Sequence, residues 1–304
     1  MVDLGSVLLA AEIVVVLAGF GYSAVADWRA REVSDRLWQI MGTVGLVLGA
    51  LIAEPGGWVP LGAWILVGAF TLQHMFAWTL GPRLERYEDL VDLALYVLVV
   101  LAVAAAAIRF GVGPSGVPYP TIALLFTVLV ARGLFEAGLL FGGADAKAVM
   151  IAGILIPIFA HPYLVSSSAV LPATAVLPFA LNLLMDAALL SVVIPLGLSV
   201  RNASRGELRG WATFTGYTIP VRELPVRFVW VRNPMSSEGR AEEDEIETSE
   251  QDRQRRVRIA KELTGQGVDR VWVTPQIPYL VLLAVGALAA LLAGNLVIDL
   301  ISLF

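Results

Sequence analysis

Two aspartates, Asp27 and Asp145, stand at the edges of apolar segments of the sequence. Asp27 follows the first apolar segment, and Asp145 precedes the sixth. An ionisable side chain at membrane depth costs several kcal/mol unless it is paired or hydrated, so it is retained mainly where it has a function. The sequence therefore indicates these two carboxyl groups as the leading candidates for chemistry.

A pair of carboxyl groups at close range can hydrolyse a peptide bond without a metal or a covalent intermediate. Two such groups share a proton and titrate as a pair. The ionised member can activate a water, and the protonated member can donate to the scissile carbonyl oxygen. The alternative is that each aspartate merely caps a helix at the membrane interface.

The neighbours of the two aspartates suit a substrate-binding slot. Gly142, Gly143 and Ala144 remove bulk directly before Asp145, so a substrate backbone can approach closely. Lys147 could pair with a carboxylate or face solvent. Two further basic residues follow Asp27, and we include them in the predicted active-site loop: Arg29 and Arg31.

The composition is that of an integral membrane protein. Of 304 residues, 58% are hydrophobic and 15% charged, and the mean hydropathy is +0.77. The chain has no cysteine, which excludes disulfides and thiolate sites, and its two histidines, His74 and His161, are too far apart for a metal-binding spacing. We expect no cofactor, no metal and no nucleic-acid partner.

Eight segments are long and apolar enough to be read as membrane spans, which need about 20 residues each. The predicted fold class is therefore an all-α polytopic membrane protein with about eight transmembrane helices. The predicted spans are residues 4–26, 37–53, 59–79, 91–110, 119–140, 147–165, 172–199 and 277–302.

Basic residues gather in alternate connections, after the first, third, fifth and seventh spans. Cytoplasmic loops retain Lys and Arg, so these connections are predicted to be cytoplasmic and both termini to lie outside. Both aspartates then lie on the cytoplasmic side of the cell membrane. The basic residues used are Arg29, Arg31, Arg36, Arg83, Arg86, Lys147, Arg201, Arg205 and Arg209.

One polar insert interrupts the apolar pattern. The predicted organisation is a transmembrane core at 1–200, a cytoplasmic α+β insert at 201–275 and a C-terminal transmembrane helix at 276–304. Short apolar runs within 211–231 predict a few small strands, and 253–263 predicts a polar helix. The acidic stretch 238–252 predicts a mobile tract. A negative tract could raise the local concentration of a basic substrate.

Other polar residues near the spans have simpler interpretations. Asp35 is the main rival for a catalytic place, although a helix N-terminal cap is the simpler role. Asn182 and Asp186 share a helix face and could hold a substrate backbone or form an interhelical hydrogen bond, and we favour the hydrogen bond. Gly45 and Gly49 form a small-residue helix-packing motif.

The stretch Asp27-x-Arg29-x-Arg31-x-Val33, taken with the stretch 142–147 around Asp145, resembles the archaeal preflagellin and prepilin peptidases. These are GxGD-type membrane aspartyl proteases related to the bacterial type IV prepilin peptidases. The likeness covers residues 1–55 and 119–200 most firmly and the insert loosely. It implies that both aspartates are catalytic and that the substrates are pilin-like or archaellin-like precursors with short basic leader peptides, cut at the cytoplasmic face.

The sequence also departs from that family. Ala144 stands where the usual motif has glycine, and the spans at 59–79 and 91–110 form an additional hairpin, which preserves the side on which both aspartates lie. The bacterial relatives often carry a cysteine-rich insert and methylate the product. With no cysteine here, methyl transfer is not expected.

Two other functions stay open. A presenilin-type intramembrane protease has a similar motif but expects both aspartates deeper inside the spans. A proton-coupled secondary transporter could use Asp27, Asp145 and Asp186 as carriers, but it expects acids near mid-span and an inverted repeat, which the sequence does not show. A structural assembly scaffold would leave the two motifs unexplained.

Overall fold

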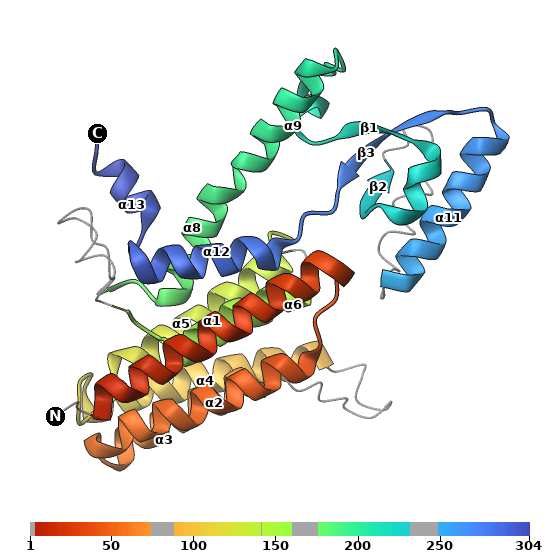
Figure 1. The fold of residues 1–304 in the computed structure, drawn as a ribbon. Coiled ribbons are helices and arrows are strands. Elements are labelled where there is room, and N and C mark those ends of the chain that lie inside the picture. Colours follow the sequence, from red (N-terminus) through yellow and green to blue (C-terminus); the bar gives the residue numbers. More distant parts are fainter. Residues whose placement is uncertain (1–3, 74–87, 141, 160–175, 232–248) are drawn as a thin grey trace. The chain divides into compact units, whose positions relative to one another are not determined.

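The computed structural model describes residues 4–73, 88–140, 142–159, 176–231 and 249–304 (Figure 1). The chain divides into two compact units, each with its own hydrophobic core. We call residues 1–25, 33–189 and 279–304 the helical unit, and residues 26–32 and 190–278 the sheet unit. The first segment of the sheet unit is the end of the first helix, which carries Asp27.

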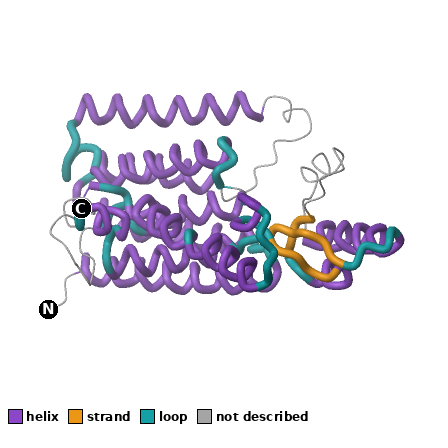
Figure 2. Tube along the Cα trace, turned by 90° about the horizontal axis from the view of Figure 1, so that it is seen from above, coloured by secondary structure: helices purple, strands orange, loops and turns teal. Residues whose placement is uncertain are grey.

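The helical unit is built from apolar helices that lie side by side (Figure 2). Its helices are α1 (Leu4–Ala30, whose end belongs to the sheet unit), α2 (Asp35–Ala53), α3 (Trp58–Gln73), α4 (Glu88–Phe110), α5 (Tyr119–Glu136), α6 (Gly143–Leu155), α8 (Phe179–Ser191), α12 (Tyr279–Leu292) and α13 (Leu296–Ile301).

Helix α6 lies in the centre of this unit and packs against α2, α5 and α12. Its residues from Ala148 to Leu155 are all buried. A helix that is apolar on every side is stable only when other helices surround it. The helix that begins beside Asp145 is therefore held by packing along most of its length.

Glycines let the helices approach closely. A Cβ atom at Gly49 would lie 2.0 Å from the Trp64 ring of α3, and one at Gly45 would lie 3.1 Å from the Ile154 side chain of α6. The Trp64 indole also donates a hydrogen bond to the Leu46 carbonyl of α2, at 3.0 Å. The predicted packing role of Gly45 and Gly49 is confirmed.

The apolar helices agree with a polytopic helical membrane protein, while the count of eight spans stays a prediction. The apolar helices α3 and α12 are too short to count among the helices of membrane-spanning length, and α6 has only 13 residues. The predicted span ends at 74–79 and 160–165, and the start at 172–175, lie outside the described residues. The described residues include five helices long and apolar enough to cross a membrane: Leu4–Ala30, Asp35–Gly56, Leu93–Phe110, Tyr119–Glu136 and Phe179–Ser204.

Two predicted spans are not continuous helices. Within 172–199, α8 ends at Ser191 and α9 (Val193–Ser204) starts after Val192. Pro195 has no amide hydrogen, and its ring crowds the carbonyl four residues earlier, which explains the break. Within 277–302, the left-handed Gly294 (φ +93°) ends the helical run after α12. The single C-terminal helix predicted for 276–304 is therefore two helices, whereas Val192 keeps helical dihedrals (φ −60°, ψ −24°) and Phe179–Ser204 is still long enough to cross a membrane.

The turn between α12 and α13 is fixed by buried polar side chains. The Asn295 amide donates to Asn182 Oδ1 at 2.8 Å, and the Leu296 amide donates to Asp186 Oδ1 at 2.8 Å. Asn295 also caps α13 by accepting a hydrogen bond from the Ile298 amide at 3.0 Å. The predicted interhelical hydrogen bonding by Asn182 and Asp186 is confirmed.

The sheet unit contains a three-stranded antiparallel sheet, shown in orange in Figure 2. Its strands are β1 (Tyr217–Pro220), β2 (Val229–Val231) and β3 (Arg270–Pro275), in the order β1-β3-β2, with Thr218 opposite Trp272 and Trp230 opposite Thr274. Helix α11 (Ser249–Gly265) packs apolar residues on the sheet core. The predicted small strands and polar helix are confirmed.

The acidic stretch 238–252 is only partly described. Residues 249–252 form the first turn of α11, so the prediction of a mobile tract was wrong for them. Glu250 there pairs with Arg253, and an acid in a first helical turn also interacts favourably with the helix dipole. Residues 238–248 lie outside the described part of the chain.

Candidate active site

Asp27 lies in the last turn of α1, three residues before the helix ends. The sequence placed it after a span ending at residue 26, but the helix continues to Ala30. Arg31 then adopts a left-handed conformation, φ +58°, and its amide donates to the Asp27 carbonyl at 3.0 Å. This pattern is an αL helix end, although glycine is the usual residue there. The Asp27 side chain is 13% exposed.

The Arg31 side chain connects this helix end to the rest of the sheet unit. Its Nη1 donates to the Asp27 carbonyl at 3.0 Å and lies 3.9 Å from Asp27 Oδ1. Its guanidinium lies over the Phe228 ring, 5.0 Å from the centroid. Burial lowers the pKa of Arg31, and the Asp27 charge raises it. Residues of the insert therefore help to position the segment that carries Asp27.

A second arginine uses the same aromatic ring. The Arg256 guanidinium lies 5.6 Å from the Phe228 centroid and pairs with Asp252. Gln276 donates through its side chain to Asp252 Oδ2 at 2.8 Å and through its amide to the Phe228 carbonyl at 3.0 Å. Phe228 is therefore held at its ring by the two arginines and at its backbone by Gln276.

Asp145 lies in the first turn of α6, where the helix dipole favours a negative charge. Its amide donates to the Gly142 carbonyl at 3.0 Å. A Cβ atom at Gly142 would lie 3.0 Å from Asp145 Oδ2, so the carboxyl group folds back over that glycine. Gly143, in contrast, is exposed and has open space where a side chain would be. Ala144 is half-buried and packs on the core.

Tyr279 is a neighbour of Asp145 that the sequence analysis missed. It is the first residue of α12, it is half-buried, and its phenol interacts electrostatically with the Asp145 carboxylate. The only signal in the sequence was a polar aromatic residue at the start of the last apolar segment. A phenol near a reacting carboxyl group can donate a hydrogen bond to it or to a substrate oxygen.

Lys147 pairs with Asp35. Their Nζ and Oδ1 atoms lie 2.5 Å apart, and the two side chains are 23% and 48% exposed. The pair joins the start of α2 to the first turn of α6. Lys147 thus has a carboxylate partner, as one interpretation of the sequence proposed, and that partner is Asp35. Asp35, the rival for a catalytic place, is therefore engaged in an ion pair, and the choice between it and Asp27 stays a prediction.

The predicted site residues fall into two groups. The helical unit holds Asp145 with Gly142, Gly143, Ala144 and Lys147, and it adds Tyr279 near Asp145 and Asp35 as the partner of Lys147. The sheet unit holds Asp27 and Arg31, with Arg29 exposed on the last turn of α1. The meeting of the two aspartates, which belong to different units, stays a prediction.

Comparisons with known proteins point to the same family as the motifs. Residues 209–296 match the family model described as the archaeal peptidase A24 C-terminus, type II. The chain is also 23% identical over 261 residues to an uncharacterized protein of Methanocaldococcus jannaschii, an alignment that covers 86% of this chain and 84% of the relative. No solved structure matches.

The family match lies over the insert and α12, where the sequence resemblance was loosest, and it does not include either aspartate. It therefore supports the resemblance from a part of the chain that the two motifs do not cover. This match supports an archaeal prepilin/preflagellin peptidase-like family.

Proposed function

We propose that the chain is a membrane aspartyl endopeptidase that removes short basic leader peptides from prepilin-like or prearchaellin-like precursors. Cleavage takes place at the cytoplasmic face of the cell membrane, with Asp27 and Asp145 as the catalytic residues. The observation that carries the proposal is the match to the archaeal peptidase A24 C-terminus. The same chain places Asp145 at the start of a helix, with its carboxyl group against Gly142.

Each carboxyl group has its own source of positive potential. Asp145 lies at the N-terminal end of α6, and Asp27 lies 3.9 Å from Arg31 Nη1. Positive potential favours the ionised form of both groups while they are apart. When they meet, like charges at close range cannot both stay ionised, so the pair takes up one proton. The ionised member then removes a proton from water, and the protonated member donates to the scissile carbonyl oxygen.

The substrate must present an extended backbone to this pair. A helical peptide bond is already hydrogen-bonded within its own helix, and water in the membrane interface reaches it poorly. The exposed Gly143, with open space beside it, leaves room for an extended segment next to Asp145. We therefore propose that the leader junction is unwound when it binds.

The positions of the aspartates favour this function over the two alternatives. A presenilin-type protease expects aspartates deep within spans, whereas Asp145 lies in a first helical turn and Asp27 in a last one. A transporter that used Asp186 would need that group free to exchange a cation. Asp186 is buried and accepts a hydrogen bond from the Leu296 amide, which favours a structural role.

The test is co-expression with a pilin-like precursor and measurement of leader removal on a gel. Asp27→Asn and Asp145→Asn should each slow cleavage by about a hundredfold or more, the scale of general acid–base catalysis. Asp35→Asn, a matched aspartate at the same predicted membrane face, should keep cleavage near the parent rate. Normal cleavage by either of the first two variants, at equal membrane expression, would contradict the assignment.

A further inference from the structure

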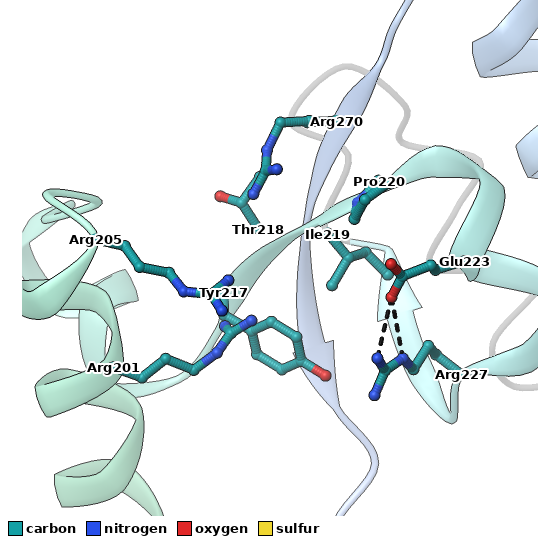
Figure 3. A pocket seen from close by; sticks show the side chains of 9 residues that line it. All are labelled: Arg201, Arg205, Tyr217, Thr218, Ile219, Pro220, Glu223, Arg227 and Arg270. Atoms are coloured by element: carbon teal, nitrogen blue, oxygen red, sulfur yellow. Dashed lines mark hydrogen bonds and ion pairs between the residues drawn. The ribbon is translucent and has the colours of Figure 1, made fainter.

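The sheet unit contains a pocket rich in arginine that the proposed peptidase chemistry does not use. Its volume is about 460 Å³. Four arginines line it together with Tyr217 (Figure 3): Arg201, Arg205, Arg227 and Arg270. They come from the end of α9, from the loop before β2 and from the start of β3, so the fold gathers positive charges from three parts of the chain.

The arginines from α9 repel each other. Arg201 and Arg205 are four residues apart at the end of the helix, a spacing that places like charges on one face and is destabilising. Arg227 adds further repulsion at Arg201, which Glu207 partly offsets. Such a cluster is unfavourable when empty, and binding of an anion relieves the repulsion.

Acidic partners neutralise only part of this cluster. Arg227 pairs with Glu223 at 3.1 Å, and Arg270 pairs with Glu207 at 3.3 Å. Arg201 stacks over the Tyr217 ring, 4.0 Å from its centroid, but its Nη1 is buried without a hydrogen-bond partner. Within the described part of the chain, Arg205 has no ion pair. A buried donor without an acceptor is costly, and a ligand oxygen would satisfy it.

We propose that this pocket binds a phosphate group. Guanidinium groups present pairs of N–H donors that fit phosphate oxygens. A phosphate with up to two charges matches Arg201 and Arg205, for which the described residues supply no ion pair. The pocket is larger than a single ion, so it has room for the group to which the phosphate is attached. The phosphate belongs either to a lipid headgroup or to a soluble phosphorylated compound. Arg201 lies in the last turn of a candidate span, where headgroups are available.

The binding test uses the purified full chain in a phosphate-free zwitterionic detergent. Isothermal titration with inorganic phosphate should show binding that weakens about tenfold or more when Arg201→Gln and Arg205→Gln are combined. Arg222→Gln, an exposed arginine of the same unit outside the pocket, should bind like the parent. Circular dichroism of all variants confirms that the fold is kept.

A second arm distinguishes the source of the phosphate. The parent and the double variant are placed in nanodiscs with or without phosphatidylglycerol, and retained lipids are counted by native mass spectrometry. If the source is a lipid, the parent retains more phosphatidylglycerol than the double variant. If it is soluble, lipid retention is equal and inorganic phosphate binds equally in both kinds of disc.

The proposal is overturned if the parent binds neither probe, or if the double variant binds both probes as the parent does. Acetate in place of phosphate serves as a control for simple charge screening, and it should bind much more weakly to the parent. None of these readouts depends on leader cleavage, so failure of the peptidase assignment would not be mistaken for failure of this one.

Discussion

The two units hold their aspartates by different kinds of interaction. In the helical unit, Asp145 begins a helix that is buried on all sides, and its carboxyl group lies against a glycine. In the sheet unit, Asp27 lies at a helix end that Arg31 connects to the Phe228 ring. Packing contacts of the first kind are insensitive to salt, whereas charge contacts of the second kind are partly screened by it. Sterics therefore dominate at one aspartate and electrostatics at the other.

The largest effect on stability is expected where the backbone of a neighbouring helix leaves no room for a side chain. A Cβ atom at Gly286 of α12 would lie 2.4 Å from the Leu183 carbonyl oxygen of α8, and backbone atoms cannot rotate away. Gly286→Ala should therefore lower the free energy of unfolding by roughly 1–3 kcal/mol, measured by denaturation in detergent. Gly62→Ala in α3, where the space is open, should be neutral or slightly stabilising. Equal effects of the two substitutions would contradict the packing account.

The next effect concerns the glycine pair beside Asp145. In Gly142→Ala the new Cβ would lie 3.0 Å from Asp145 Oδ2, so the carboxyl group must shift. We expect leader cleavage to slow about tenfold, because small displacements of reacting groups are costly. Gly143→Ala meets no protein atom within 4 Å, so it should leave kcat near the parent value and raise KM, because the new methyl group enters the space proposed for the substrate. If Gly143→Ala lowered kcat more than Gly142→Ala did, the steric role of Gly142 would be wrong.

A smaller effect is expected at the arginine–aromatic contact of the sheet unit. Phe228→Leu removes the ring that Arg31 and Arg256 share, and each such contact contributes about 0.5–1 kcal/mol at exposed sites. Thermal unfolding should detect this loss, and the difference from the parent should shrink at high salt. The matched control is Phe214→Leu, whose ring lies beside Trp211. A loss that does not change with salt would point to packing alone.

The smallest effect is expected at the ion pair between Lys147 and Asp35, because both side chains are partly exposed. A double-mutant cycle with Lys147→Met and Asp35→Asn should give a coupling energy of about 1 kcal/mol or less, falling as salt is added. Leader cleavage should persist in both single variants. Abolished cleavage in Asp35→Asn would return Asp35 to the list of catalytic candidates.

The sequence predicted best what depends on local patterns. Apolar runs marked the helices, the i to i+4 spacing of Asn182 and Asp186 indicated a shared face, and Gly45 and Gly49 indicated close packing. Hydropathy alone did not show the breaks at Val192 and Gly294, because the flanking residues are as apolar as a continuous span. Pro195 was the visible sign of the first break.

Contacts between segments far apart in the chain could not be predicted from local sequence patterns. Nothing local to Lys147 identifies Asp35 as its partner, and nothing local to Tyr279 places it near Asp145. The arginine pocket likewise depends on strand pairing that brings β1 and β3 together. The end of α1 was misplaced because Arg31, rather than a glycine, adopts the left-handed conformation that stops the helix.

The central claim, that the two aspartates meet, can be measured directly because the chain contains no cysteine. Asp27→Cys and Asp145→Cys are combined, and the membranes are treated with a short bifunctional thiol reagent. The account predicts efficient intramolecular cross-linking of this pair, and little for Asp27→Cys combined with Glu54→Cys, which the sequence places at the opposite membrane face. Absence of cross-linking in the first pair, with both thiols shown to be reactive, would contradict it.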